Sequence, residues 1–203
     1  MLDGICIILS GGKSSRMRED VGIDKAFLDF YGKPLYERQF EKLSKIFPKV
    51  YLSAKNSADY GQIPPQNIIE DLKTVDDIDT SSLFAPTLGM LSSFQATKAE
   101  KLFFIGVDTP FISQNSIAKI ISEPAEHKAA RHNGKIHPTI GMYDKSIYTQ
   151  LTDMIKNDRH KLTLLLEKIG TIFVDLDEGA ELANLNRYED YEKAIKDGVN
   201  PFR

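Results

Sequence analysis

Apolar residues in the first part of the chain alternate between short unbroken runs and a segment with helical spacing. Residues 5–9 are uniformly apolar and end at a glycine-containing turn. Such a run predicts a strand buried on both faces, as in a parallel sheet. Residues 49–53 predict a second strand, and residues 35–47 between them carry apolar side chains at helical spacing. The opening unit is therefore expected to be strand, helix, strand with a right-handed crossover.

The same alternation continues through the rest of the chain with one interruption. Asn133-Gly134 predicts a hairpin between residues 128–131 and 136–143, because both residues accept positive φ. We expect this hairpin to break the alternation and to cover one end of the sheet. Residues 71–82 are polar and irregular, which predicts a mobile loop. The remaining patterns predict strands at 68–71, 102–107 and 171–175, and helices at 88–99, 116–122, 151–169 (with a break near 157–158) and 188–196.

This order of elements predicts an α/β fold with a mostly parallel central sheet, helices on both faces and a small β-hairpin insertion. The 203 residues suit one domain, 1–203. The formal net charge of -3 gives no basic excess for long nucleic acids. The N-terminus lacks the basic segment of a signal peptide, and no stretch approaches the roughly 20 apolar residues of a membrane span. We therefore expect a cytoplasmic protein with no nucleic acid and no membrane partner.

A basic segment that contains two glycines follows the first predicted strand directly, as residues 9–17. In open α/β sheets, ligands gather at the carboxyl ends of strands, and glycines let backbone N–H groups approach them. Lys13, Arg16 and, further along, Lys25 add positive charge, which suits a polyphosphate. The segment is not a P-loop, because Ile7 stands where that motif needs a glycine. On composition alone, a plain turn with solvated lysines remains an equal alternative.

Polar side chains also follow or end three other predicted extended segments. Asp108 follows the strand at 102–107 and suits Mg²⁺, which prefers one or two carboxylates with phosphate oxygens and water; a capping or turn-forming role is the alternative. Asp71 can bind a ribose hydroxyl or a metal, or form a solvated turn. Asn184 and Asn186 lie two residues apart, so an extended backbone points both amides the same way. They can orient a ligand, although Asn186 can instead cap the last helix.

The lone cysteine and the histidines are weaker candidates for chemistry. Cys6 lies inside the first apolar run, so we expect a core residue and not a reactive thiol. His127, His132 and His137 lie five residues apart, which suits neither a helical metal pair nor one face of a strand. His137 precedes a proline and is expected at a fixed turn where it can touch substrate. No Ser-His-Asp or Cys-His arrangement is apparent in the sequence.

Taken together, the motifs resemble the molybdenum cofactor guanylyltransferase family, whose members join GMP from GTP to the terminal phosphate of molybdopterin and release pyrophosphate. The family signature LAGGxSxRMG, followed by DK, corresponds to residues 9–17 and Asp24-Lys25. Further matches follow in family order over nearly the whole chain: Gly32-Lys33-Pro34-Leu35, Ile69-Glu70-Asp71, Asp108-Thr109-Pro110-Phe111, His137-Pro138-Thr139-Ile140 and Asn184-Leu185-Asn186. The resemblance implies a Rossmann-like nucleotidyltransferase fold, with GTP and molybdopterin as substrates and Mg²⁺ as cofactor. It also implies transient contact with other molybdenum-cofactor biosynthesis proteins or apo-molybdoenzymes.

The resemblance also implies roles for individual residues. Backbone groups of Leu9, Ser10 and Gly11 would contact the guanine and the nucleoside, and Gly12 favours guanylyl over cytidylyl transfer. Asp108 would bind the Mg²⁺ ion. The full GTP-binding set is Leu9, Ser10, Gly11, Gly12, Lys13, Lys25, Ser53, Asp71 and Asp108. The catalytic set is Arg16, Lys25 and Asp108, and the pterin substrate would meet His137, Asn184 and Asn186.

The chain departs from the family pattern in ways that concern base and pterin contacts more than the reaction. Two alternatives therefore stay open: a related transferase that uses CTP or a sugar-phosphate acceptor, and a catalytically silent nucleotide-binding protein. The departures are Ser10 for the usual alanine, the inserted Arg18-Glu19-Asp20, Ser53 for a common asparagine, the loop Ala85-Pro86-Thr87-Leu88-Gly89 without its first glycine, and Arg187-Tyr188 for Thr-Pro.

Overall fold

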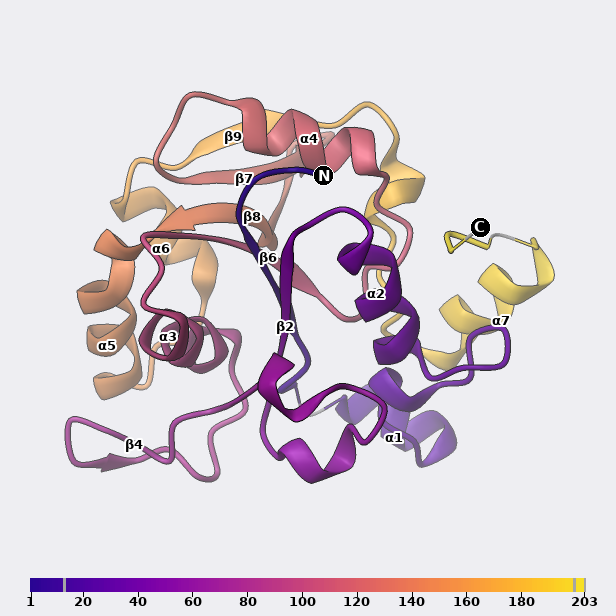
Figure 1. Cartoon of the computed structure of the whole chain (residues 1–203), viewed down its shortest axis with the longest axis horizontal. Coiled ribbons are helices and arrows are strands. Elements are labelled where there is room, and N and C mark those ends of the chain that lie inside the picture. The colour runs from indigo at the N-terminus through magenta and orange to yellow at the C-terminus, as the bar shows by residue number, and fades with distance from the viewer. Residues whose placement is uncertain (13, 199, 203) are drawn as a thin grey trace.

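The computed structural model describes residues 1–12, 14–198 and 200–202, and in this part of the chain a seven-stranded sheet forms the centre of the protein (Figure 1). Its order is β3-β2-β1-β6-β8-β7-β9, and β4 and β5 form a separate pair. The strands are β1 (Ile5–Leu9), β2 (Lys49–Ala54), β3 (Ile68–Glu70), β4 (Thr74–Val75), β5 (Ile78–Asp79), β6 (Lys101–Gly106), β7 (Lys128–His132), β8 (Lys135–Asp144) and β9 (Ile172–Asp175).

Strands β3, β2, β1 and β6 run parallel, so their carboxyl ends share one edge of the sheet. Leu9, the last residue of β1, pairs in register with Ser53 on one side and Gly106 on the other. The unbroken apolar run of β1 is buried on both faces, as its pattern predicts, and includes Cys6. Burial raises the pKa of the Cys6 thiol well above its usual value, which fits a core residue.

The hairpin signal at Asn133-Gly134 is confirmed, but the hairpin extends the sheet and does not cover its end. Asn133 and Gly134 have φ angles of 46° and 75°, and they join the antiparallel strands β7 and β8. Strand β8 pairs with β6 in antiparallel fashion, so it continues the sheet sideways. The segment 71–82, expected to be irregular, contains the antiparallel pair β4 and β5.

Of the seven helices in the described residues, α2 to α6 cover the two faces of the sheet, and α1 and α7 lie to one side (Figure 1). On one face, α2 and α4 pack against Phe103 and Ile105 of β6, and on the other, α3, α5 and α6 pack against Phe104. None of these helices is long and apolar enough to cross a membrane. The helices are α1 (Ser15–Val21), α2 (Leu35–Ser44), α3 (Pro86–Thr97), α4 (Gln114–Ser122), α5 (Tyr148–Lys156), α6 (Leu162–Lys168) and α7 (Tyr188–Lys196).

Helix α1 replaces part of the loop that the sequence led us to expect after β1. Its N-cap, Ser14, has a left-handed conformation (φ 48°, ψ 32°) and makes no capping hydrogen bond with its side chain. The helix ends at Gly22, whose φ of 73° is easily reached without a side chain. Asp20 of α1 lies 3.6 Å from the guanidinium of Arg187 and accepts a hydrogen bond from the Tyr188 backbone, which ties α1 to the start of α7.

Candidate active site

A cavity of about 130 Å³ opens at the edge of the sheet where β1, β2 and β6 end. Segments far apart in the sequence meet there: the turn after β1, the start of α3, the residue after β6 and Thr139 of β8. Apart from Lys13, which lies outside the described residues, every residue predicted to bind GTP lines this cavity. The lining residues are Leu9, Ser10, Gly11, Gly12, Ser14, Asp24, Lys25, Ser53, Asp71, Ala85, Pro86, Gly89, Gly106, Val107, Asp108 and Thr139.

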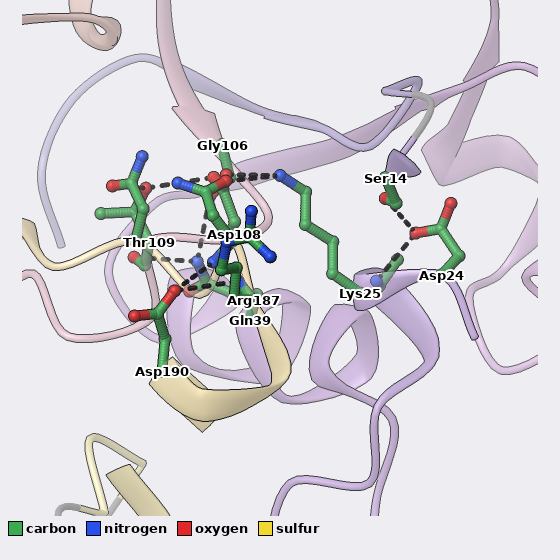
Figure 2. Close-up of polar contacts among 12 residues, drawn as sticks. Ser14, Asp24, Lys25, Gln39, Gly106, Asp108, Thr109, Arg187 and Asp190 are labelled. Atoms are coloured by element: carbon green, nitrogen blue, oxygen red, sulfur yellow. Dashed lines mark hydrogen bonds and ion pairs between the residues drawn. The ribbon is translucent and has the colours of Figure 1, made fainter. Parts of the chain in front are cut away.

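Two residues of the cavity lining, Lys25 and Asp108, form an ion pair (Figure 2). Lys25 Nζ lies 2.6 Å from Asp108 Oδ2, and the two side chains are 18% and 14% exposed. Lys25 Nζ also lies 3.3 Å from Asn186 Oδ1. Asp108 is not a helix cap, because the N-cap of α4 is Ser113. A carboxylate at the end of a buried strand can instead hold a metal ion that arrives with phosphate oxygens, if the ammonium moves onto the phosphate.

The carboxyl group of Asp71 lies deeper in the cavity, between two glycines. Ser53 Oγ donates a hydrogen bond of 3.3 Å to Asp71 Oδ1. A Cβ atom on Gly11 would lie 3.0 Å from Asp71 Oδ2, and one on Gly89 would lie 2.9 Å from Ser53 Oγ. Burial raises the pKa of Asp71 to about 6, although Lys55 and the Ser53 hydroxyl lower it in part. The altered Ala85–Gly89 loop thus keeps one glycine, Gly89, and this glycine lies against Asp71 and Ser53.

Asp24 and Ser14 are cavity residues to which we assigned no role from the sequence. Asp24 Oδ1 accepts hydrogen bonds from Ser14 Oγ at 2.8 Å and from the Ala26 backbone at 3.0 Å (Figure 2). Arg18 donates to the other oxygen, Oδ2, at 3.1 Å. Asp24 therefore caps the 3₁₀ helix Lys25–Phe27 and fixes the start of the Lys25 side chain. An aspartate two residues before an alanine that begins a turn is a local capping signal, and it could have pointed to this role.

The segment with Asn184 and Asn186 lies beside the Lys25–Asp108 pair. The Leu185 backbone donates a hydrogen bond of 2.8 Å to the Asp108 carbonyl oxygen. Thr109 Oγ1 donates to Asn184 Oδ1 at 3.5 Å. Asn186 is not the N-cap of α7, because that position belongs to Arg187, and the Asp190 carboxylate accepts from both backbone N–H groups (Figure 2). Both amide oxygens thus accept hydrogen bonds from residues that adjoin the Lys25–Asp108 pair.

Four predicted site residues in the described part of the chain do not line the cavity: Arg16, His137, Asn184 and Asn186. Arg16 lies exposed on α1 and makes no hydrogen bond or ion pair within the described ranges. His137 is buried on β8, where burial and the charges of Lys135 and His132 lower its pKa below the usual value. Its neighbour Thr139 reaches the cavity instead. A role for Arg16 therefore requires that its side chain swing toward a bound ligand.

The described residues contain no cluster of three His, Cys, Asp or Glu side chains that could hold a metal ion by themselves. Mg²⁺ is often held by one or two carboxylates together with phosphate oxygens and waters. Asp108 fits that pattern, because its carboxylate lies at the cavity and already pairs with the Lys25 ammonium. The arrangement suits a metal ion that arrives with a nucleotide and not one bound permanently by protein ligands.

Comparison with known proteins gives the family of the chain. The family described as MobA-like NTP transferase domain matches residues 6–171. A protein of Campylobacter jejuni named molybdenum cofactor guanylyltransferase is 31% identical over 194 residues, with 93% of each chain covered. A protein of the same name from Helicobacter pylori is 31% identical over 202 residues, covering 96% of this chain and 91% of that protein.

The fold also has a counterpart among solved structures. The crystal structure of molybdopterin-guanine dinucleotide biosynthesis protein A from Archaeoglobus fulgidus superposes with a TM-score of 0.76 at 16% identity. The superposition covers 96% of this chain and 98% of that one. The predicted fold class and the family resemblance are confirmed: the chain belongs to the MobA-like NTP transferase family and is a nucleotidyltransferase.

Proposed function

We propose that the protein transfers GMP from GTP to the terminal phosphate of molybdopterin, with Mg²⁺, and releases pyrophosphate. The observation that carries the proposal is the convergence of the glycine turn after β1, Lys25 and Asp108 on one cavity. Backbone N–H groups, an ammonium and a carboxylate that can share a metal are the groups that a polyphosphate needs. The name of the curated relatives supports guanine as the base and molybdopterin as the acceptor.

In this proposal, Asp71 reads the guanine base. Guanine presents an N1–H and a 2-amino group side by side, and a carboxylate accepts such a pair through its two oxygens. Cytosine presents one amino group at the corresponding edge, so it would leave part of the carboxylate without a partner. Gly11 and Gly89 keep the space around Asp71 and Ser53 free of side chains. The backbone of Leu9, Ser10 and Gly11 would complete the nucleoside contacts, as the family resemblance implies.

The acceptor needs no general base. A phosphate monoester has a second pKa near 6 and is mostly dianionic at neutral pH. One of its oxygens would attack the α-phosphorus of GTP, and the bond to the β-phosphate would break with its electron pair leaving on pyrophosphate. The difficulty is the repulsion between two anions, which the Lys25 ammonium would offset. Asp108 would hold Mg²⁺, which when bound supplies further positive charge to the phosphates.

The remaining residues have roles that rest on less structural support. Asn184 and Asn186 would orient the pterin substrate, since both lie beside the Lys25–Asp108 pair. Arg16 would grip phosphate oxygens after a change of side-chain conformation. His137 would meet the pterin substrate, as its place before a proline and the family resemblance suggest. The cytoplasmic location is inferred from the sequence, and the contacts with other molybdenum-cofactor proteins from the family resemblance.

Binding of a whole nucleotide requires the cavity to open. Its volume of about 130 Å³ is below the roughly 300 Å³ at the lower end for small-molecule pockets. Lys25 lines the cavity and is held to Asp108, so transfer of its ammonium from Asp108 to a phosphate is the simplest way to make room. Both groups would keep a partner of opposite charge, Lys25 the phosphate and Asp108 the metal.

The test is pyrophosphate release with molybdopterin, Mg²⁺ and each of GTP, CTP, ATP and UTP in turn. The proposal expects release with GTP and little with the others, and no release when a sugar phosphate replaces molybdopterin. Release with CTP or with the sugar phosphate would favour the related-transferase alternative. Binding of GTP without any release would favour a catalytically silent protein.

A further inference from the structure

We propose that Gln39, a buried residue of α2, positions the turn that carries Asp108 and thereby sets how strongly Mg²⁺ supports GTP binding. The inference rests on the proposed function, because it assigns the metal to Asp108. Gln39 lies outside the cavity lining and touches neither Lys25 nor the Asp108 carboxylate. Its action would therefore pass through the backbone of the turn.

The contacts of Gln39 bracket Asp108 in the sequence. Its amide Nε2 donates to the carbonyl oxygen of Gly106 at 3.4 Å and to that of Thr109 at 3.1 Å (Figure 2). These carbonyls belong to residues two before and one after Asp108. Gln39 is fully buried and Thr109 is 1% exposed. No other group in the described part of the chain donates to the Thr109 carbonyl, so Gln39 alone keeps it paired.

The carbonyl oxygen of the Gln39 side chain makes this contact informative. Gln39 Oε1 is buried and has no hydrogen-bond partner among the described residues. An unpaired buried carbonyl costs free energy, and an apolar side chain of the same size would avoid that cost. The core therefore gains nothing from a glutamine here except the two hydrogen bonds to the turn.

Movement of this turn would move the Asp108 carboxylate. Asp108 Oδ1 lies so close to Gly106 that a Cβ atom there would overlap it. Oδ1 also accepts from Thr109 Oγ1 at 3.4 Å, while Oδ2 pairs with Lys25. The residues that Gln39 holds are thus the residues against which the carboxylate rests, and loss of its donor would loosen the proposed metal ligand.

A second residue of the same helix provides a matched comparison. Lys42, one turn after Gln39, donates from Nζ to the carbonyl oxygens of Pro110 and Ile112 at 2.7 and 2.6 Å. Lys42 thus anchors the same connection between β6 and α4, but beyond the part that holds Asp108. If loosening any part of the connection weakened Mg²⁺ binding, substitutions of Gln39 and of Lys42 would have the same effect. If the position of Asp108 is what matters, substitution of Gln39 has the larger effect.

The test measures GTP binding by calorimetry with MgCl₂ and with EDTA, on wild type, Gln39→Met and Lys42→Met. We expect Gln39→Met to remain folded and to bind GTP in EDTA with the wild-type affinity. MgCl₂ should raise its GTP affinity about 10-fold less than it raises that of wild type, as is typical when a group that orients a metal ligand is removed. Lys42→Met should lose less than about 3-fold of that gain, since its contacts lie farther from Asp108.

If MgCl₂ raises the GTP affinity of Gln39→Met as much as that of wild type, the inference is overturned and the proposed function stays intact. An equal loss in Lys42→Met would also overturn it, because the effect would then be general to the connection. If Gln39→Met does not fold, Gln39→Asn keeps a polar amide but shortens its reach by one methylene, and the same loss is expected. Absence of any Mg²⁺ effect in wild type would overturn the proposed function and the inference with it.

Discussion

The ammonium nitrogen of Lys25 lies 2.6 Å from the carboxylate oxygen Oδ2 of Asp108, in an ion pair that joins residues 83 positions apart. The pair is largely shielded from water, so removal of one partner leaves the other charged and poorly solvated. A triphosphate with Mg²⁺ offers each group a replacement partner. The ion pair is therefore a contact that a nucleotide can exchange without leaving a buried charge unpaired.

Loss of either partner should disable the enzyme. We expect Lys25→Ala and Asp108→Ala to fold and to lower kcat/KM by roughly 10²-fold or more, because each removes a charge already aimed at the phosphates. Lys119→Ala is the control, since Lys119 pairs with exposed Asp177 and does not line the cavity. Steady-state kinetics with GTP and molybdopterin measures the effect. Near-normal turnover by either site variant would refute the assignment.

A methyl group on Gly106 should have a related effect without removing any charge. A Cβ atom there would overlap Asp108 Oδ1, so Gly106→Ala must push the carboxylate away from its position beside Lys25. We expect kcat to fall by roughly 10-fold or more. Gly61→Ala is the matched control, because nothing lies within 4 Å of its Cβ position. Equal kinetics for Gly106→Ala and wild type would show that the carboxylate position is not critical.

The carboxyl group of Asp71 should make GTP binding dependent on pH. Burial raises the pKa of Asp71 to about 6 in the free protein, and only the ionised form accepts both guanine N–H groups. GTP binding should therefore weaken as pH falls from 7 to 5, by up to about 10-fold per pH unit below the pKa. Phosphate groups titrate in the same range, so Asp71→Asn is the reference. Identical pH profiles for the two proteins would remove Asp71 from the site.

The same pKa shift predicts how Asp71 affects stability. Because the pKa is raised on folding, the folded protein binds the proton more tightly than the unfolded chain does. The stabilising contribution is complete below about pH 3.9 and is lost as pH rises through about 6. A shift from 3.8 to about 6 corresponds to about 3 kcal/mol. Asp71→Asn should therefore be more stable than wild type at pH 7.5, with a smaller difference at pH 5, in urea denaturation.

The amides of Asn184 and Asn186 should affect the acceptor more than the nucleotide. We expect Asn184→Ala and Asn186→Ala to raise KM for molybdopterin by roughly 10-fold, as loss of a buried polar contact with substrate typically does, and to leave KM for GTP nearly unchanged. Asn186→Ala also removes a hydrogen-bond partner of Lys25. The kcat of this variant therefore measures how far that contact matters for the Lys25 position. Unchanged kinetics for both variants would exclude this segment from the acceptor site.

The strands of the central sheet and most helices could be predicted because their residues carry a clear hydrophobic pattern, which the short strands β4 and β5 lack. The apolar run of β1 and the spacing of α7 give the bounds that the structure has. The pattern does not predict helix α1, because this helix has seven residues and buries one of them, Met17. In addition, the side chain of its N-cap, Ser14, makes no capping hydrogen bond. Sequence periodicity has little to measure in so short a helix.

The part of the site that could be predicted consists of local motifs and of residues at the shared edge of the sheet. Parallel pairing of β1 with β2 and β6 brings Leu9, Ser53 and Gly106 side by side, so residues that follow these strands meet. The bond from Lys25 to Asn186 and those from Gln39 to the Asp108 turn depend on how helices and loops pack on that edge. Arg16 was expected in a loop at the ligand, but α1 carries it on an exposed face.

The most direct test is a crystal structure of the protein with Mg²⁺ and a GTP analogue that cannot be cleaved between the α- and β-phosphates. We predict that the triphosphate lies between the Gly11-Gly12 turn and Asp108, with guanine at Asp71, the metal at Asp108 and the Lys25 ammonium moved onto a phosphate oxygen. A nucleotide bound elsewhere, or a triphosphate bound while Lys25 stays paired with Asp108, would contradict this account.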